Sequence, residues 1–163
     1  MIETVWGGEA SPIINNVIGE FVADRVFGDD RKFIDFTSLG VVSHETLIAG
    51  VVYHNFCPQQ GTIEISAAAD DPRWFARHVI YEMYEYPFEQ LDCRMVIHTT
   101  SELNKTVISI LRRLGFSETR IEAIRGPNEA EIIFTLTKEQ WKSNGFHKEH
   151  KNGQKRQQRT ETT

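Results

Sequence analysis

The segment that most restricts the fold of this chain is a predicted strand that runs from Thr62 directly into a helix beginning at Pro72. Two isoleucines alternate with polar residues in its first half, which is the period-two pattern of a half-buried strand. Asp70 or Asp71 can cap the helix, and proline suits the first turn because its missing N–H would have no partner there. The free N–H groups at such a helix start can bind a phosphate.

The neighbouring segments predict a mixed, mostly antiparallel sheet of the α/β (α+β) class with helices on both faces. The strands that begin at Thr62 and Arg94 are joined by a helix, so a right-handed crossover should place them side by side and parallel. Pro87 should end that helix near Tyr86, and residues 32–38 fit either a strand or a short helix. The other predicted elements are a helix from Ser11-Pro12 to Gly28 with Ile14, Val17, Ile18, Phe21 and Val22 buried, a hairpin of residues 39–42 and 47–55, a helix from Leu103 or Asn104 to Leu114, strands 117–123 and 131–136, and a short turn at 137–141.

Charge divides the chain into an acidic body and a basic tail. The formal net charge is −5 over 163 residues, but residues 142–163 hold six Lys or Arg and two Glu, a net charge of +4. Residues 1–141 therefore carry −9, which is unsuited to binding duplex nucleic acid. We expect residues 1–141 to form one domain and the polar tail to be disordered and mainly solubilising, with RNA, DNA or an acidic partner as the alternative role.

Targeting and metal-binding patterns are not found in the sequence. No apolar run is long enough to span a bilayer, and no secretory signal is recognisable at the N-terminus. Cys57 and Cys93 lie far apart without a CxxC spacing, which favours reduced thiols and a cytoplasmic protein. The six histidines show no HxxxH or HxH spacing, so no metal site is predicted.

Several motifs in order resemble the GCN5-related N-acetyltransferases (GNAT), near the branch of ribosomal-protein N-terminal acetyltransferases. They are Asp71-Pro72-Arg73, residues 86–91, Asn104, and residues 111–116. The chain also resembles small acetyltransferase-like proteins of phages and prophages, which implies a location in the host cytoplasm. The motifs of that second likeness, within a resemblance that covers residues 41–141, are residues 50–55, Ile63-Glu64, Arg73-Trp74, residues 86–88 and Arg125-Gly126.

The resemblance implies that acetyl-coenzyme A lies in a V-shaped cleft between the two parallel strands. In the family, the pyrophosphate binds a loop of pattern (Gln/Arg)-x-x-Gly-x-(Gly/Ala), which aligns here with residues 73–78. Ala76 and His78 replace the two small residues of that pattern, while Arg73, Arg77 and His78 offer side-chain cations. The cofactor-binding residues implied in this way are Ala67, Ala68, Ala69, Arg73, Trp74, Phe75, Ala76, Arg77, His78 and Asn104. The alternative roles are helix packing for the alanines and helix capping for Asn104.

The resemblance also implies direct acetyl transfer to an amine, without an acyl-enzyme. Glu64 is the preferred general base, His54 is the alternative, and Ser66 would position a water or the substrate. The tyrosine that acts as general acid in many family members corresponds to Leu111. Ser101, His98 or a water would therefore protonate the thiolate, or the thiolate would leave unassisted. The predicted acceptor-binding residues are Tyr53, Arg125 and Glu131.

Two other functions remain open from the sequence. The missing glycines and tyrosine are compatible with a non-catalytic binding or virion-associated protein that retains the fold after losing affinity for the cofactor. A nucleic-acid-directed modification would depend only on the basic tail. For an enzyme, the acceptor would be a small-molecule amine, a protein N-terminus or a lysine, and a homodimer is compatible with the sequence.

Overall fold

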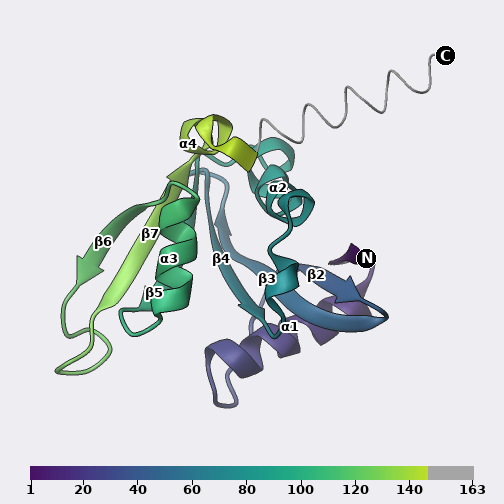
Figure 1. Ribbon diagram of the computed structural model, residues 1–163, viewed down its shortest axis with the longest axis horizontal. Helices are drawn as coiled ribbons and strands as arrows, with labels where there is room; N and C mark the ends of the chain where they lie inside the picture. Colours follow the sequence, from purple (N-terminus) through teal and green to yellow (C-terminus); the bar gives the residue numbers. More distant parts are fainter. Residues whose placement is uncertain (147–163) are drawn as a thin grey trace.

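A computed structural model describes residues 1–146 and has a seven-stranded mixed sheet with helices on both faces (Figure 1). The strands are β1 (Ile2–Gly7), β2 (Thr37–Ser43), β3 (Thr46–Cys57), β4 (Thr62–Ala69), β5 (Met95–Ser101), β6 (Ser117–Ile121) and β7 (Glu131–Thr137). The helices are α1 (Pro12–Val26), the 3-10 turn η1 (Pro72–Trp74), α2 (Arg77–Glu85), the π-helical turn η2 (Tyr86–Gln90), α3 (Lys105–Arg113) and α4 (Lys138–Ser143).

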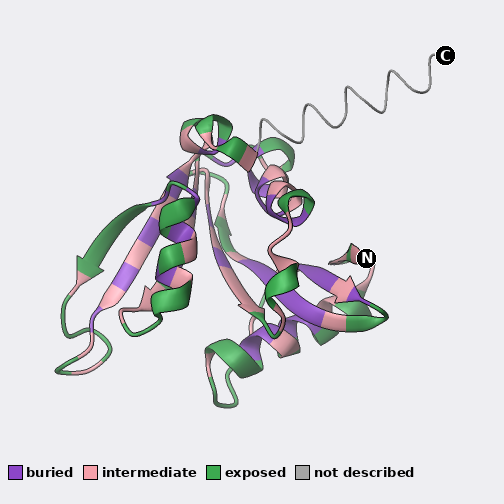
Figure 2. Cartoon of the chain, viewed as in Figure 1, coloured by how far each residue is buried: buried purple, intermediate pink, exposed green. Residues whose placement is uncertain are grey.

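The sheet order is β1-β2-β3-β4-β5-β7-β6. β4 and β5 are parallel and are connected through α2, whereas each other neighbouring pair is antiparallel. This confirms the predicted mixed sheet and the parallel pair. Residues 32–36 form no helix or strand, β2 begins at Thr37, and β6 ends at Ile121 instead of Ala123. Figure 2 shows that β6 is exposed along its length, as suits a short edge strand.

Helix α1 packs closely on one face of the sheet because two paired glycines lie beneath it. Gly40 and Gly50 are paired across β2 and β3, and a Cβ on Gly50 would lie 2.7 Å from Val22 Cγ2. The prediction that Ile14 and Val17 are buried is wrong, because they are 38% and 55% exposed. The helix instead turns Ile18 and Val22 to the sheet glycines, and its buried positions are Ile18, Gly19, Val22 and Ala23.

The predicted continuous helix from Pro72 is divided in two. Asp71 accepts a hydrogen bond from the backbone N–H of Arg73 and caps the 3-10 turn, so the predicted aspartate cap exists at η1. Phe75 then leaves the helical region, and Ala76 is extended with ψ 149°. Helix α2 therefore begins at Arg77, since Trp74 and Phe75 turn their rings toward the core.

The α-helix ends at Glu85, next to Tyr86 as predicted, but the chain stays helical through Pro87 in a wider turn. The chain continues as a π turn, in which the N–H of Leu91 donates to Tyr86 O. Proline has no N–H to donate to the carbonyl of Met83, four residues earlier. The buried Tyr53 hydroxyl donates to that carbonyl at 2.6 Å and replaces the missing helical bond. A contact from the sheet thus permits the proline to stay within the helix.

The C-terminal part of the described chain packs on the same face as α2. A capping box between Thr137 and Gln140 begins α4, and Trp141 is fully buried. The predicted domain boundary after Trp141 falls inside α4, and Phe146 packs against the ring of Phe75 at 6.0 Å. Most of the predicted basic tail, from residue 147 onward, lies outside the described residues. Within residues 1–146, no helix is long and apolar enough to cross a membrane.

Candidate functional site

A V-shaped opening separates β4 from β5. Their parallel pairing covers Thr62–Glu64 with Met95–Ile97 and ends there, before the point near Ala68 and His98 where separation was expected. β4 remains paired with β3 as far as Ala69, and β5 remains paired with β7 over its whole length. Each strand is therefore held by its outer neighbour, and the edges that face one another beyond the pairing are unpaired (Figure 1).

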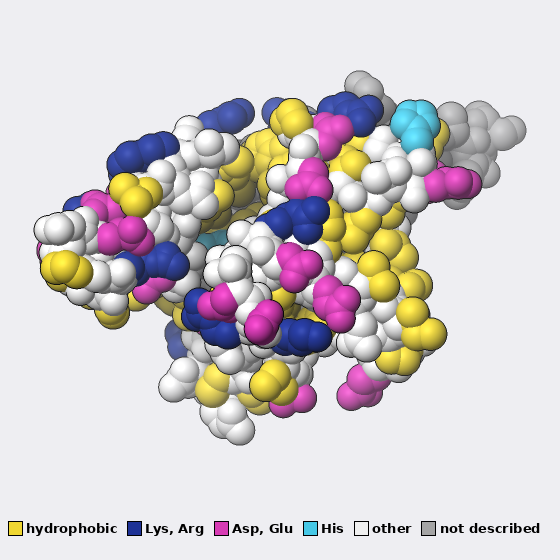
Figure 3. Space-filling view, turned by 90° about the horizontal axis from the view of Figure 1, so that it is seen from below, with side chains coloured by type: hydrophobic (Ala, Val, Ile, Leu, Met, Phe, Trp, Pro, Cys, Tyr) yellow, Lys and Arg dark blue, Asp and Glu magenta, His cyan; other side chains and the backbone are white. Residues whose placement is uncertain are grey.

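Figure 3 views the molecule from the open end of this V. A recess lies between the part formed by β5–β7 and the part formed by the other strands, and hydrophobic side chains line its walls. Ala67 and Ala68 are partly exposed on β4, and Ala69 is exposed at its end. Ala67 packs against the core on the α2 side, whereas Ala68 pairs with Gly50 on the α1 side. Small side chains thus leave this edge of β4 accessible.

The face of β3 and β4 that α1 covers carries a polar cluster. Glu64 accepts a hydrogen bond of 2.9 Å from the side-chain amide of Asn55. His54 Nε2 and Ser66 Oγ are hydrogen-bonded at 2.9 Å, and the His54 ring lies 5.0 Å from that of Phe33. Burial lowers the pKa of His54, and the charge of Glu64 opposes that shift. The structure therefore brings together Glu64, His54 and Ser66, the three predicted strand residues.

The opposite face of the same strands is apolar and closed. Tyr53, predicted to contact the acceptor, is 2% exposed and bonded to Met83 as described above. His98 is also buried there, with its Nε2 3.2 Å from the Tyr84 hydroxyl. Desolvation lowers the pKa of His98 to about 3, so its ring is neutral near pH 7. His98 is thus unable to act as an imidazolium acid in the folded protein.

The residues of the predicted pyrophosphate loop have separate partners. Arg73 is held by Asp71 through short contacts of 2.6–3.1 Å. The Arg77 guanidinium lies 5.0 Å from the centroid of the Phe146 ring, and His78 Nε2 is 3.1 Å from Ile2 O. Ala76 offers no side-chain cap to α2, so the N–H groups of its first turn face outward as they do at a phosphate-binding helix start.

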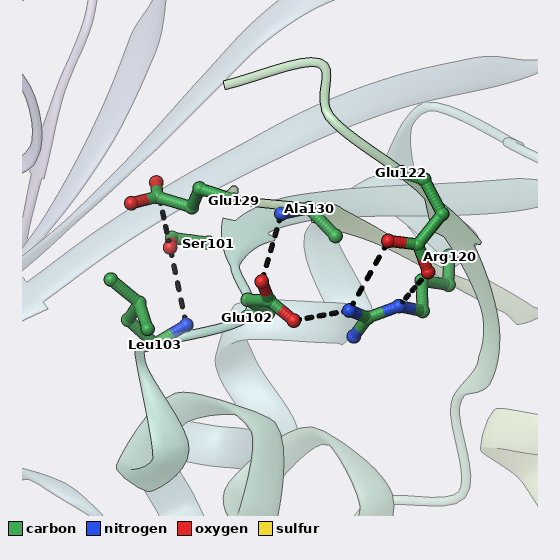
Figure 4. A network of polar contacts seen from close by, with 7 residues as sticks. All are labelled: Ser101, Glu102, Leu103, Arg120, Glu122, Glu129 and Ala130. Atoms are coloured by element: carbon green, nitrogen blue, oxygen red, sulfur yellow. Dashed lines mark hydrogen bonds and ion pairs between the residues drawn. The ribbon is translucent and has the colours of Figure 1, made fainter. Parts of the chain in front are cut away.

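Ser101 lies at the far end of the V, beside Glu129 of the β6–β7 connection (Figure 4). Of the three predicted acceptor residues, Arg125 and Glu131 also lie at this end, whereas Tyr53 is in the core. The Ser101 hydroxyl donates to Glu129 at 3.0 Å, and Arg125 pairs with the same carboxylate at 3.6 Å. Glu102 accepts from the N–H of Ala130 at 3.0 Å, which fastens the connection to the start of α3. Glu131 pairs with Ser101 across β5 and β7. Asn104 accepts from the N–H of Val107 at 3.4 Å as the cap of α3, and Leu111 is buried.

Two residues of this region were missed by sequence reasoning. Asn55, which orients Glu64, has a φ of 52°, a conformation that asparagine adopts more readily than most residues. The β3–β4 register shifts between His54 and Cys57, and an asparagine beside a predicted strand end was a usable signal for such a bulge. Glu129 had no local signal, because its contacts depend on how the β6–β7 connection folds back. Within the described residues, no group of three or more His, Cys, Asp or Glu side chains is placed to hold a metal ion.

Comparison with known proteins shows the fold. No family model and no curated protein matches the sequence. The spermidine/spermine N-acetyltransferase from Vibrio cholerae is similar in structure, with a TM-score of 0.63 and 13% identity over 86% of this chain and 97% of that one. The ribosomal-protein-S5-alanine acetyltransferase from Vibrio fischeri has a TM-score of 0.56 and 16% identity over 65% of this chain and 63% of that one. A GNAT-family acetyltransferase from Bacillus anthracis has a TM-score of 0.52 and 15% identity over 63% of this chain and 66% of that one.

The chain spans 63–66% of the length of five matched acetyltransferases, just under two thirds. At these identities, the likeness establishes the GNAT fold and leaves the reaction to be argued from the site itself.

Proposed function

We propose that this protein is an N-acetyltransferase that moves an acetyl group from acetyl-coenzyme A to an amine within a ternary complex. The observation that carries the proposal is the parallel β4–β5 pair that opens beyond Glu64 and Ile97. A sheet without such an opening would offer no unpaired strand edge in its interior, where an extended amide-bearing ligand could lie between two strands. The neighbours of the same fold named above are acetyltransferases, which supports this reaction class.

The residues around the opening fit acetyl-coenzyme A, which when bound supplies an activated acetyl thioester. The free edge of β4 would hold the pantetheine amides, with the backbone at Ala67 or Ala68 donating to the thioester carbonyl. The uncapped start of α2 and the Arg77 guanidinium would hold the pyrophosphate. Arg73 would contribute only by exchanging its contact with Asp71, and Asn104 would act through the start of α3.

Glu64 is the group we assign as general base. The amine nitrogen attacks the thioester carbonyl, the carbon–sulfur bond breaks, and the nitrogen proton passes to Glu64 directly or through water. Asn55 holds one oxygen of the Glu64 carboxylate by a hydrogen bond. His54, hydrogen-bonded to Ser66, is the alternative acceptor of the amine proton. A thiol pKa of about 8.5 allows the thiolate to leave without an acid, which suits a site where Leu111 replaces the family's tyrosine.

Titration with acetyl-coenzyme A tests the cofactor assignment. At roughly a hundred times its Kd, a ligand that binds the folded protein alone adds about 2.7 kcal/mol to the free energy of unfolding. We expect a rise in melting temperature that saturates with acetyl-coenzyme A and is weaker with pantetheine, which lacks the pyrophosphate. No rise at millimolar cofactor would contradict the proposal.

The variant Glu64→Gln tests the base. We expect slower acetyl transfer to a panel of amines, peptide N-termini and lysine peptides, with the affinity for acetyl-coenzyme A little changed. Glu3→Gln, an exposed position on β1, is the matched control and should transfer at the rate of the unchanged protein. Equal rates for Glu64→Gln and Glu3→Gln would remove Glu64 from the mechanism.

A second candidate function is a non-catalytic binding or virion-associated protein that keeps the GNAT fold without binding the cofactor. Two observations favour it: Arg73 is paired with Asp71, and the Arg77 guanidinium lies over the Phe146 ring instead of being directed only by the loop. This candidate predicts no stabilisation by acetyl-coenzyme A, so the titration above separates the two.

A further inference from the structure

A second recess lies at the other edge of β3, away from the V. β2 pairs with β3 only as far as Tyr53, whereas β3 continues to Cys57. A cavity of about 630 Å³ lies beside the end of β1 and the beginning of β2. It is bounded by the start of α1, residues 33–37 and η2. The glycine at position 8 and the absence of helix in residues 33–36 leave this cavity uncovered.

Aromatic side chains form much of the wall of this cavity. Phe33, Phe36 and Tyr86 are half-buried, Phe56 is 42% exposed, and Tyr53 is buried behind them. Two of these rings are held by residues outside the cavity. The Tyr86 ring lies 4.9 Å from that of Trp6, and the Phe36 ring occupies the place where a Cβ on the α1 glycine at position 19 would be. A preformed group of ring faces binds a ligand with little loss of side-chain entropy.

The charge at the cavity has one sign. Glu9 and Asp35 both line it and are exposed, and its lining residues include no Lys, Arg or His. Neither carboxylate has an ion-pair partner or a hydrogen bond within residues 1–146. By contrast, the exposed Asp29 and Asp70 and the half-buried Asp71 are each paired with an arginine.

We propose that this cavity binds an organic cation, an ammonium group carried on an apolar body. Ring faces attract a cation through their quadrupole, and the two unpaired carboxylates complement its charge. An anion would meet uncompensated negative charge, and a neutral apolar molecule would gain nothing from Glu9 and Asp35. The proposal does not depend on acetyl transfer. The two sites are connected through Phe33, which lines the cavity and contacts His54 of the polar cluster.

Choline and its uncharged isostere 3,3-dimethylbutan-1-ol test this proposal, because they differ in charge and scarcely in shape. We expect a two-dimensional NMR titration with choline to shift the backbone signals of Gly8, Thr37 and Tyr53, and to leave those of Ala68 and Ser101 in place. The isostere should bind about tenfold more weakly. Equal affinities for the two compounds would indicate a neutral apolar ligand and would overturn the proposal, as would shifts located at the V.

The double variant Glu9→Gln, Asp35→Asn should weaken choline binding at least about fivefold. Asparagine suits position 35, where φ is 51°. The control is Glu3→Gln, Asp24→Asn, which removes the same charge from exposed positions outside the cavity. An equal loss of affinity in the control would assign the attraction to the overall acidic charge and contradict a specific site. Phe56→Ala should weaken choline binding with unchanged melting temperature; unaltered binding in that variant would also count against the site.

Discussion

The two faces of the β3–β4 pair differ in what their side chains contact. Toward α2, Tyr53, Ile63 and Ile65 are at most 2% exposed and pack into the main core. Toward α1, His54, Glu64 and Ser66 stay partly exposed and are hydrogen-bonded to polar neighbours. Successive residues of a strand point to opposite faces, so neighbouring positions have different roles. One face contributes most to stability, and the other holds the groups available for chemistry.

The largest expected effect follows from Ile65→Ala on the core face. Removing a fully buried isoleucine side chain leaves a cavity and costs about 2–5 kcal/mol of unfolding free energy. Urea denaturation followed by circular dichroism measures the loss. Ser66→Ala, one residue along the same strand, serves as the control and should cost only about 0.5–1.5 kcal/mol, the net contribution of its hydrogen bond to His54. Similar losses in the two variants would contradict the division between the faces.

A pH dependence is the next effect in size and comes from His98 on the core side of β5. Its pKa is about 3 in the folded protein and about 6.5 in an unfolded chain, so below pH 6.5 the unfolded state binds the additional proton. Stability should therefore be complete above pH 6.5 and fall as the pH decreases, by about 2 kcal/mol between pH 6.5 and 5.

The variant His98→Gln isolates this contribution. It retains an amide that can bond to the Tyr84 hydroxyl but has no proton to gain. Its unfolding free energy should vary less between pH 6.5 and 5 than that of the unchanged protein. The same slope in both proteins would show that other groups cause the acid sensitivity.

Tyr53→Phe should cost about 1–3 kcal/mol, because the carbonyl of Met83 would lose its donor inside the core. Pro87 has no N–H that could take over this role. Tyr86→Phe is the control, since the structure shows no hydrogen bond for that hydroxyl among residues 1–146. Thermal unfolding of both variants compares them, and a smaller loss in Tyr53→Phe than in Tyr86→Phe would rule out the proposed repair of the helix.

The sequence was sufficient to predict the order of most elements and the parallel strand pair, because both depend on local periodicity and connection lengths. It was insufficient around Pro87, where a hydroxyl from a distant strand satisfies the carbonyl that proline leaves unbonded. It also failed for α1, whose exposed Ile14 and Val17 fit the helical period as well as the buried positions do. The close packing of Val22 against Gly50 determines which face of α1 is buried, and this is a tertiary contact.

For the candidate site, strand alternation was sufficient to group Glu64 with Ser66 and to separate Tyr53 from His54. The partners of Arg73, His78 and Ser101 were not predictable. Each depends on a neighbouring side chain or backbone group whose position the fold determines: Asp71, Ile2 O and Glu129.

The smallest effect concerns His54 and tests whether the polar face is one electrostatic unit. The charge of Glu64 raises the pKa of His54 against the lowering by burial, so Glu64→Gln should lower it further. Proton NMR titration of the imidazole signals measures the change, with Glu3→Gln as the control that should leave it in place. Since Gln retains a side-chain oxygen that Asn55 can bond, a lower pKa would reflect the lost charge more than a rearranged strand. An unchanged pKa would mean that water screens the two groups from each other. His54 could then serve only as an independent base, and loss of activity in Glu64→Gln would be attributable to Glu64 alone.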